Sequence, residues 1–190
     1  MGTSELYEAL NYVNHSREKR LEMAHLVSEN PHLVKPLLDI ALKIDDPISA
    51  KACWVMEFTA RENLPYIFPH LDPFTENLQS LKLESSIRPF AKICELLCIS
   101  YFKQKDESVQ NAVGEIHLER MATACFDWLI GDYKVAPKAY SMTSLLLMGS
   151  KFKWIHPELK MVLEQNYGTG SAAYKARSRM ILTKLKKAGF

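Results

Sequence analysis

The sequence contains little glycine and no long apolar run. Glycine supplies 7 of its 190 residues, whereas leucine, alanine, glutamate, lysine and methionine fill long stretches, a composition that favours helices over sheets. No window approaches the about 18 apolar residues that a membrane span needs, and the N-terminus lacks the basic and then apolar layout of a secretory signal. We therefore expect an all-α cytoplasmic protein that contacts no membrane.

Sequence motifs for metal binding and catalysis are also missing. The chain has no His-Glu-x-x-His pair, no serine elbow and no Walker loop. Its 4 cysteines lie in apolar stretches, where a thiol behaves as a small hydrophobic group. Cys94 and Cys98 share a predicted helix face, but a structural zinc ion needs four ligands and no second pair is present. We expect reduced core cysteines, no metal, no cofactor and no catalytic residue.

Acidic residues are absent from the last part of the chain. The net charge is +2, which by itself indicates no class of partner, but residues 171–190 hold basic side chains and no acid. Such asymmetry is typical of a surface for nucleic acid or another acidic partner. A solvated terminal helix is the commoner explanation, because cations are favoured near a helix C-terminus. The sequence leaves both interpretations open.

The hydrophobic pattern predicts helices along nearly the whole chain. Apolar residues recur at steps of three and four, and prolines stand at several predicted helix starts, where their missing N–H has no helical partner. The polar segment 103–114 is predicted to be a surface loop. We expect a single domain over residues 1–190, with N-terminal cap helices over 1–30 and helix pairs over 31–63, 64–102, 115–150 and 155–188.

One short pattern occurs four times in the predicted second helices. Each copy begins with an apolar residue, contains a lysine or arginine and has an alanine about one turn later. The leading residues Ile48, Ile87, Val135 and Ala172 are 39, 48 and 37 residues apart. Two-helix units with a period in this range are the sequence signature of HEAT and armadillo arrays. The sequence therefore predicts a right-handed α-α superhelix of about four helix pairs.

The repeated pattern resembles the HEAT consensus, in which the second helix of each pair begins with aspartate, a branched residue, arginine and alanine. Asp46, Ile48, Lys51 and Ala52 match this pattern loosely, and so does the segment 132–139. The basic residue is displaced from its consensus position in three of the four copies. The resemblance implies a HEAT-like or armadillo-like solenoid.

The whole chain also resembles a group of short bacterial helical proteins, through runs such as YVNHSREKR, IRPFAKICE, KAYSMTSL, WIHPEL and SAAYKARSR. Members of that group often carry the label adenylosuccinate lyase, which would imply an enzyme. Gly170, Ser171 and Lys175 give a gapped match to the lyase signature loop, but its asparagine and its Met-Pro pair are absent. We expect the chain to have no lyase activity, because it is too short to supply the several distant segments of that active site.

A row of cations is the main functional hypothesis. In a stacked array the second helices line the concave surface, which would set one basic residue from each repeat beside the next. The alternative is structural, with each cation covering its own helix start or pairing with a neighbouring acid. The residues that we expect to bind a partner are Lys51, Trp54, Phe58, Arg61, Arg88, Lys138, Tyr140, Tyr174 and Lys175.

Two kinds of extended, acidic partner fit this surface. A protein or an acidic peptide is the first expectation, since solenoids present extended concave binding surfaces. The alternative is nucleic-acid backbone, by resemblance to the HEAT-like alkylpurine DNA glycosylases, whose basic concave face cradles duplex DNA. The modest net charge favours a protein partner over DNA.

A weaker candidate is an anion site at the start of the last helix. Free N–H groups at a helix start can hold an anion, and the break between the last two predicted helices leaves such groups next to a lysine. The residues of this candidate site are Gly170, Ser171 and Lys175.

Overall fold

The computed structural model describes residues 1–190 and contains helices and no strands, which confirms the predicted all-α class. No helix has the length and apolar character that crossing a membrane requires. The α-helices are α1 (Thr3–Ala9), α2 (Arg17–Glu29), α3 (Val34–Ala41), α4 (Ser49–Glu62), α5 (Leu71–Glu76), α6 (Glu84–Cys98), α7 (Glu107–Ala112), α8 (Glu115–Ile130), α9 (Val135–Met148), α10 (Ile155–Tyr167) and α11 (Ala172–Lys187).

Short helices of other types join these elements. The 3₁₀ helices are η1 (Leu10–Tyr12), η2 (Pro31–Leu33), η3 (Leu64–His70) and η4 (Leu78–Ser80), and a π-helix, η5 (Ile99–Gln104), extends α6. Lys105, in the left-handed conformation with φ of 56°, ends η5. That residue turns the chain sharply into α7.

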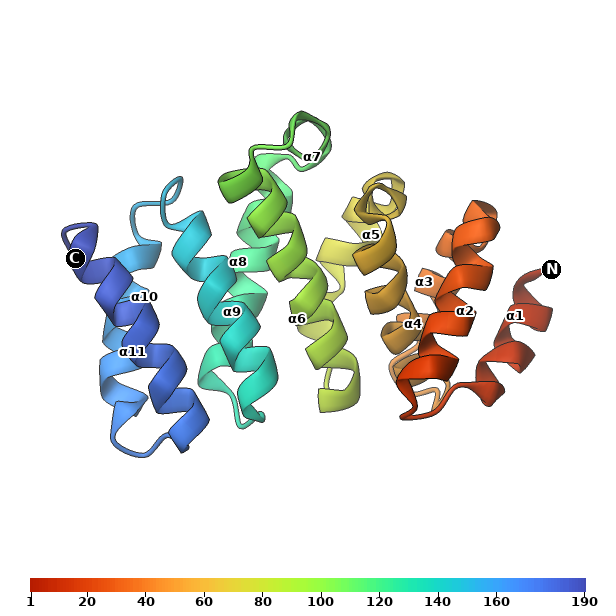
Figure 1. The fold of residues 1–190 in the computed structure, drawn as a ribbon, viewed down its shortest axis with the longest axis horizontal. Helices are drawn as coiled ribbons and strands as arrows, with labels where there is room; N and C mark the ends of the chain where they lie inside the picture. The colour runs from red at the N-terminus through yellow and green to blue at the C-terminus, as the bar shows by residue number, and fades with distance from the viewer.

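The helices follow one another across the molecule, with the two termini at opposite ends (Figure 1). In what we call the first row, α2, α4, α6, α9 and α11 each pack against the next member. Behind it, α3 packs on α4, α8 on α9 and α10 on α11, while α1 contacts α3 and α5 contacts α8. The helices therefore form two layers. We call the back layer, which comprises α1, α3, α5, α8 and α10, the second row.

A single hydrophobic core fills the space between the two rows. It comprises 50 buried residues drawn from α1 through α11, with Phe74, Phe90 and Trp128 among its largest fully buried side chains. Burying one leucine or phenylalanine stabilises the fold by about 1.5–3 kcal/mol. Because each helix has apolar residues on the side facing the other row, neither row could bury its own apolar surface alone.

All four cysteines are free and buried, as their apolar setting predicted. Burial raises the pKa of the Cys53 thiol to about 12, and burial also raises the pKa of Cys94 and Cys98. These thiols are therefore protonated at neutral pH and serve as packing groups, since reactivity requires the thiolate. No group of three or more His, Cys, Asp or Glu side chains is placed to hold a metal ion.

Three segments differ from the sequence-based prediction. The segment 103–114, expected to be a loop, contains α7, because Asp106 caps that helix by accepting the N–H of Ser108 at 2.9 Å. The sequence predicts a first amphipathic helix from Thr3 or Ser4 to Val13, but α1 ends at Ala9 and the chain continues as η1. The sequence also predicts that Pro47 lies in the first turn of the next helix after Asp46, whereas Pro47 lies in a turn before α4, where the Asp46 carboxylate accepts the N–H of Ile48 at 2.9 Å.

Candidate functional site

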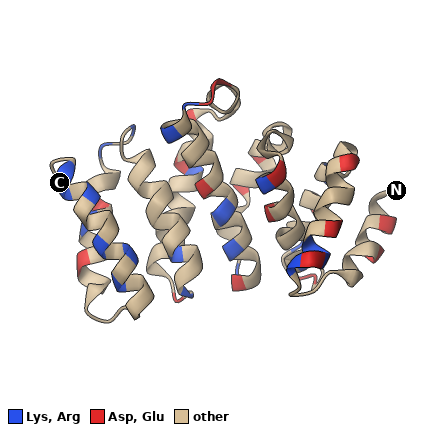
Figure 2. Cartoon of the chain, in the orientation of Figure 1, with Lys and Arg blue, Asp and Glu red and all other residues tan.

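Two buried glutamates organise the cations of the first row. Glu57 on α4 and Glu95 on α6 are 1% and 5% exposed. A carboxylate buried this deeply loses most of its hydration, a cost that only nearby cations and hydrogen-bond donors can offset. Each glutamate has cations around it. Figure 2 shows basic residues on α6, α9 and α11 along this row.

Glu57 joins α4 to α6 through two arginines. Arg61, one turn further along α4, donates from Nε and Nη2 to Oε1 at 3.0 and 2.7 Å. Arg88 of α6 places Nη2 at 3.0 Å from Oε2. Both oxygens therefore face a guanidinium group, although only Oε1 accepts a hydrogen bond. Removing the charge would leave the two guanidinium groups facing each other.

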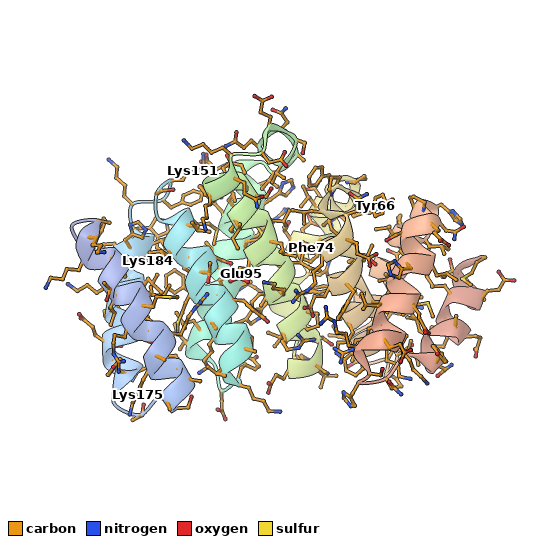
Figure 3. The ribbon with its side chains drawn as sticks, in the orientation of Figure 1. Tyr66, Phe74, Glu95, Lys151, Lys175 and Lys184 are labelled. Atoms are coloured by element: carbon orange, nitrogen blue, oxygen red, sulfur yellow. The ribbon has the colours of Figure 1, made fainter.

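Glu95 forms a second cluster that links three helices. Lys92, one turn earlier on α6, lies 2.6 Å from Oε2. Arg177 of α11 lies 3.5 Å from Oε1 and donates to the hydroxyl of Thr143 on α9. Arg177 thus reaches past α9 to α6. Figure 3 labels Glu95 near the centre of the row.

Trp54 is fixed by an unusual hydrogen bond. Its indole N–H donates to the carbonyl of Ser85 on α6 at 2.8 Å. Pro89 stands four residues after Ser85 and has no N–H, so the carbonyl of Ser85 lacks its usual helical donor. The proline therefore leaves an acceptor that holds Trp54 in one orientation.

Arg20 of α2 covers the aromatic side chains beside Glu57. Its guanidinium lies 5.4 and 5.6 Å from the ring centroids of Trp54 and Phe58, and the ring of His15 lies 5.0 Å from that of Trp54. Burial lowers the pKa of Arg20, with a further contribution from the charge of Arg88. Arginine nevertheless stays protonated in proteins, so two cations face each other here.

These side chains border an open pocket of about 560 Å³ where α2, α4, α6 and the start of α9 meet. We call it the Arg20 pocket. Cations outnumber carboxylates among its lining residues, and the tryptophan forms an apolar wall. The lining residues are His15, Arg20, Trp54, Glu84, Ser85, Arg88, Lys134, Val135 and Ala136.

A second open pocket, also of about 560 Å³, lies between α9 and the connection from α10 to α11. It brings together Lys138 and Tyr174, with the ammonium 5.9 Å from the ring centroid. Gly170 and Ser171 line it as well. However, the N–H of Gly170 donates to a backbone carbonyl at 3.1 Å, and the Ser171 hydroxyl caps α11 by accepting the N–H of Tyr174 at 3.2 Å. These two groups are therefore engaged in ending one helix and starting the next.

The predicted partner-binding residues fall into separate neighbourhoods. Trp54, Phe58, Arg61 and Arg88 gather around Glu57. Tyr140 belongs to the Glu95 cluster, where the ammonium of Lys92 lies 4.9 Å from the centroid of the Tyr140 ring. Lys138 and Tyr174 lie at the second pocket. Lys51 donates to the carbonyl of Asn11 at 3.0 Å. Lys175 lies at the lower end of α11 in Figure 3.

Several residues of these clusters were not predicted from the sequence. The spacing of Glu57 and Arg61, and of Lys92 and Glu95, is that of neighbours on one helix face, and this was the only sequence signal for them. The contacts from other helices carried no local signal. The residues missed are His15, Arg20, Glu57, Lys92, Glu95, Lys134, Thr143 and Arg177.

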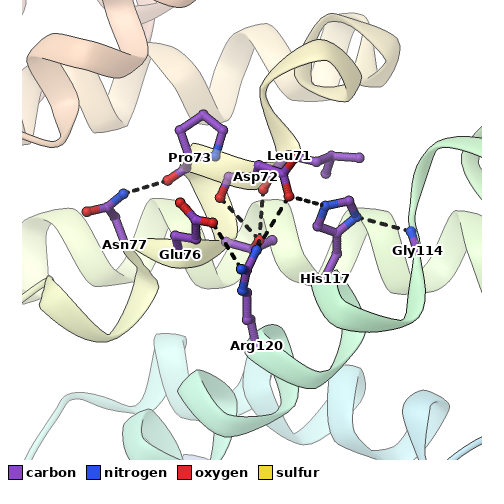
Figure 4. A network of polar contacts seen from close by, with 9 residues as sticks. Leu71, Asp72, Pro73, Glu76, Asn77, Gly114, His117 and Arg120 are labelled. Carbon is purple, nitrogen blue, oxygen red and sulfur yellow. Dashed lines mark hydrogen bonds and ion pairs between the residues drawn. The ribbon is translucent and has the colours of Figure 1, made fainter.

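A different polar network ties α5 to α8 in the second row (Figure 4). His117 accepts the N–H of Gly114 at Nδ1, at 3.1 Å, so its proton resides on Nε2, which lies 3.0 Å from the Asp72 carboxylate. Arg120 contacts Asp72 at 3.5 Å and Glu76 at 2.9 Å. The hydrogen bond from His117, together with the charge of Arg120, lowers the pKa of Asp72. Since both nitrogens of His117 are engaged, the network fastens two helices together.

The fold and these clusters define an all-α protein whose first row carries cations held by buried carboxylates. No protein-family model, curated protein or solved structure matches the chain. The resemblances to HEAT repeats and to the lyase-labelled bacterial group therefore stay predictions.

Proposed function

We propose that this protein is a non-catalytic HEAT-like scaffold that binds an acidic segment of a partner protein along the exposed side of its first row. The observation that supports this most is the excess of cations there: Arg20, Arg61, Arg88, Lys92 and Arg177 lie around the two buried carboxylates of Glu57 and Glu95. Positive charge that the protein does not neutralise itself is available to an acidic partner.

The packing supports a solenoid of four helix pairs within a single domain. Three pairs pack directly, α3 with α4, α8 with α9 and α10 with α11. In the remaining pair, α5 meets α6 through the rings of Phe74 and Phe90, whose centroids are 5.0 Å apart. The second member of each pair packs against its counterpart in the next pair, which is the nearest-neighbour stacking of repeat proteins. Such stacking gives one extended surface, suited to an extended ligand. We place the protein in the cytoplasm, where buried free thiols stay reduced.

Aromatic side chains add apolar contact area to this basic surface. Trp54, Phe58 and Tyr140 are partly buried and packed on the core, with Arg20 or Lys92 beside their rings. Exposed ion pairs contribute little affinity individually, about 0–1 kcal/mol each, but they steer a partner and set its register. Anchoring on partly buried aromatic rings supplies the apolar contact that an interface also needs.

Fluorescence anisotropy tests the proposal with three labelled probes: an oligoglutamate peptide, an oligolysine peptide of equal length and a random DNA duplex. We expect the acidic peptide to bind with an affinity that falls as salt rises. Its affinity for the Arg20→Glu/Lys138→Glu double variant should be lower by about tenfold or more. The Lys103→Glu/Lys153→Glu variant is the control, because both lysines are exposed and lie outside the clusters.

Equal binding by the two double variants would contradict the proposal. Tighter binding of the duplex than of the acidic peptide would favour the alternative of nucleic-acid backbone, which relies on phosphate contacts and falls steeply with salt.

A further inference from the structure

The Arg20 pocket has more positive charge than its surroundings neutralise. Arg20, Arg88 and Lys134 line it, and Glu84 is the one carboxylate among its lining residues. Glu57 lies next to the pocket but is shared between Arg88 and Arg61. Counting Arg61 with Glu57, four cations face two carboxylates, which leaves an excess of two positive charges.

The two guanidinium groups at this pocket are held in place before any ligand arrives. Arg20 donates from Nε to the carbonyl of Ser16 at 3.2 Å and from Nη2 to that of His15, and its Cζ lies 5.4 Å from the ring centroid of Trp54. Arg88 is held by Glu57 at 3.0 Å. Because a guanidinium has five N–H donors, each arginine keeps several for a ligand, and their immobilisation lowers the entropic cost of binding.

From this arrangement we propose that the Arg20 pocket binds a phosphate monoester dianion. An excess of two charges is balanced by a monoester, which carries about −1.5 to −2 at pH 7, whereas a carboxylate or a phosphodiester carries one negative charge. The planar fork of arginine also matches phosphate oxygens two at a time. Trp54 would pack against the organic group that bears the phosphate.

Phosphate binding would specify what the scaffold surface recognises. It rests on the proposed function only for the source of the phosphate. On the scaffold surface that source is a phosphorylated side chain of the partner. A free phosphorylated small molecule has the same recognition chemistry, so the experiment has to distinguish the two.

Two-dimensional ¹H–¹⁵N spectra of the full chain provide the readout. The indole N–H signal of Trp54 is assigned by its loss in Trp54→Phe and followed during titration with four probes: a phosphoserine peptide, the same peptide with glutamate in place of phosphoserine, free O-phosphoserine and inorganic phosphate. We expect the Trp54 signal to move with the phosphoserine peptide, and the dissociation constant to be at least about tenfold lower than for the glutamate peptide.

Two variants test the assignment of the cations. Arg20→Gln and Lys134→Gln should each weaken phosphoserine binding by about tenfold, and Lys134 is exposed, so its replacement does not endanger folding. Arg17→Gln is the matched control, because Arg17 is exposed on the same helix as Arg20 and does not line the pocket. Circular dichroism and thermal melting check that all three variants are folded.

The outcomes separate the pocket from the wider surface. A higher affinity for the phosphoserine peptide than for O-phosphoserine would indicate that the phosphate comes from a partner chain. Equal affinities would indicate a small molecule. Either result supports phosphate binding in the Arg20 pocket. Equal affinity for the glutamate and phosphoserine peptides, or unchanged affinity in both pocket variants, would overturn it. If the pocket proposal fails in this way, oligoglutamate binding that is still weakened by replacing Lys138 would continue to support the scaffold function.

Discussion

The clusters around Glu57 and Glu95 use the same device in different ways. In each, a buried glutamate on a first-row helix holds one cation from its own helix and one from another. At Glu95 the second cation comes from α11 and is fixed by Thr143, so the cluster fastens three helices. At Glu57 a third helix, α2, places Arg20 nearby as well. No carboxylate engages Arg20 directly, and it faces an open pocket.

The difference indicates what a structural ion pair would need in order to bind a partner. A buried carboxylate that is paired with every cation around it serves mainly the fold, because it holds those cations in place between helices. Adding one more fixed cation beside an aromatic wall leaves charge for a ligand to neutralise. By this criterion we propose the Glu57 cluster as a site for a partner, whereas the Glu95 cluster ties α6, α9 and α11 together.

The largest expected effect separates the two glutamates by stability. Glu57→Gln removes the charge that holds two arginines within 3.0 Å, and we expect the free energy of unfolding to fall by about 2–3 kcal/mol. Glu95→Gln should cost about 1–2 kcal/mol, because one of its two cations is 3.5 Å away. Urea denaturation followed by circular dichroism measures both, and an equal or reversed order would show that the two clusters do not differ in this way.

A smaller effect is expected at the tryptophan of the Arg20 pocket. Trp54→Phe keeps an aromatic ring but loses the indole N–H that donates to the Ser85 carbonyl, which should lower the free energy of unfolding by about 1 kcal/mol. Trp154→Phe is the control, since Trp154 is 54% exposed and should change stability by less than about 0.5 kcal/mol. Equal losses in the two variants would mean that the hydrogen bond to Ser85 does not anchor Trp54.

The smallest effect concerns the exposed network of the second row. Because the pKa of Asp72 is lowered in the folded state, the carboxylate stabilises the fold above its unfolded pKa, and this contribution is lost as pH falls through the lowered folded value. Asp72→Asn should therefore be slightly less stable than the parent at pH 7 and match it at the acid end, below about pH 3. Melting temperatures across that range check this. A constant difference at every pH would assign the effect to shape rather than to charge.

The helices and the state of the cysteines could be predicted from the sequence because they depend on local composition. Sparse glycine and apolar residues at helical spacing predict helices wherever they occur, and thiols within such stretches predict burial. Asp106 shows the limit of that approach: its capping bonds create α7 within a segment that composition alone predicted to be a loop.

The clusters could not be predicted, because each depends on residues that only the packing brings together. Glu57 and Glu95 look in the sequence like ordinary exposed helix acids, and nothing local indicates that they are buried. Arg177 reaches Glu95 from α11, and Arg20 meets Trp54 from a different helix. Lys51 was grouped with other lysines by the repeat pattern, yet its closest polar contact is the carbonyl of Asn11 in η1.

The most direct measurement maps where an acidic peptide binds. Amide and indole signals of the ¹⁵N-labelled chain, followed during titration with oligoglutamate, should move along the exposed side of α2, α4, α6, α9 and α11, most strongly near Trp54 and Lys138. Shifts confined to α8 and α10 of the second row, or no shifts at low salt, would contradict the assignment of the first row as the binding surface.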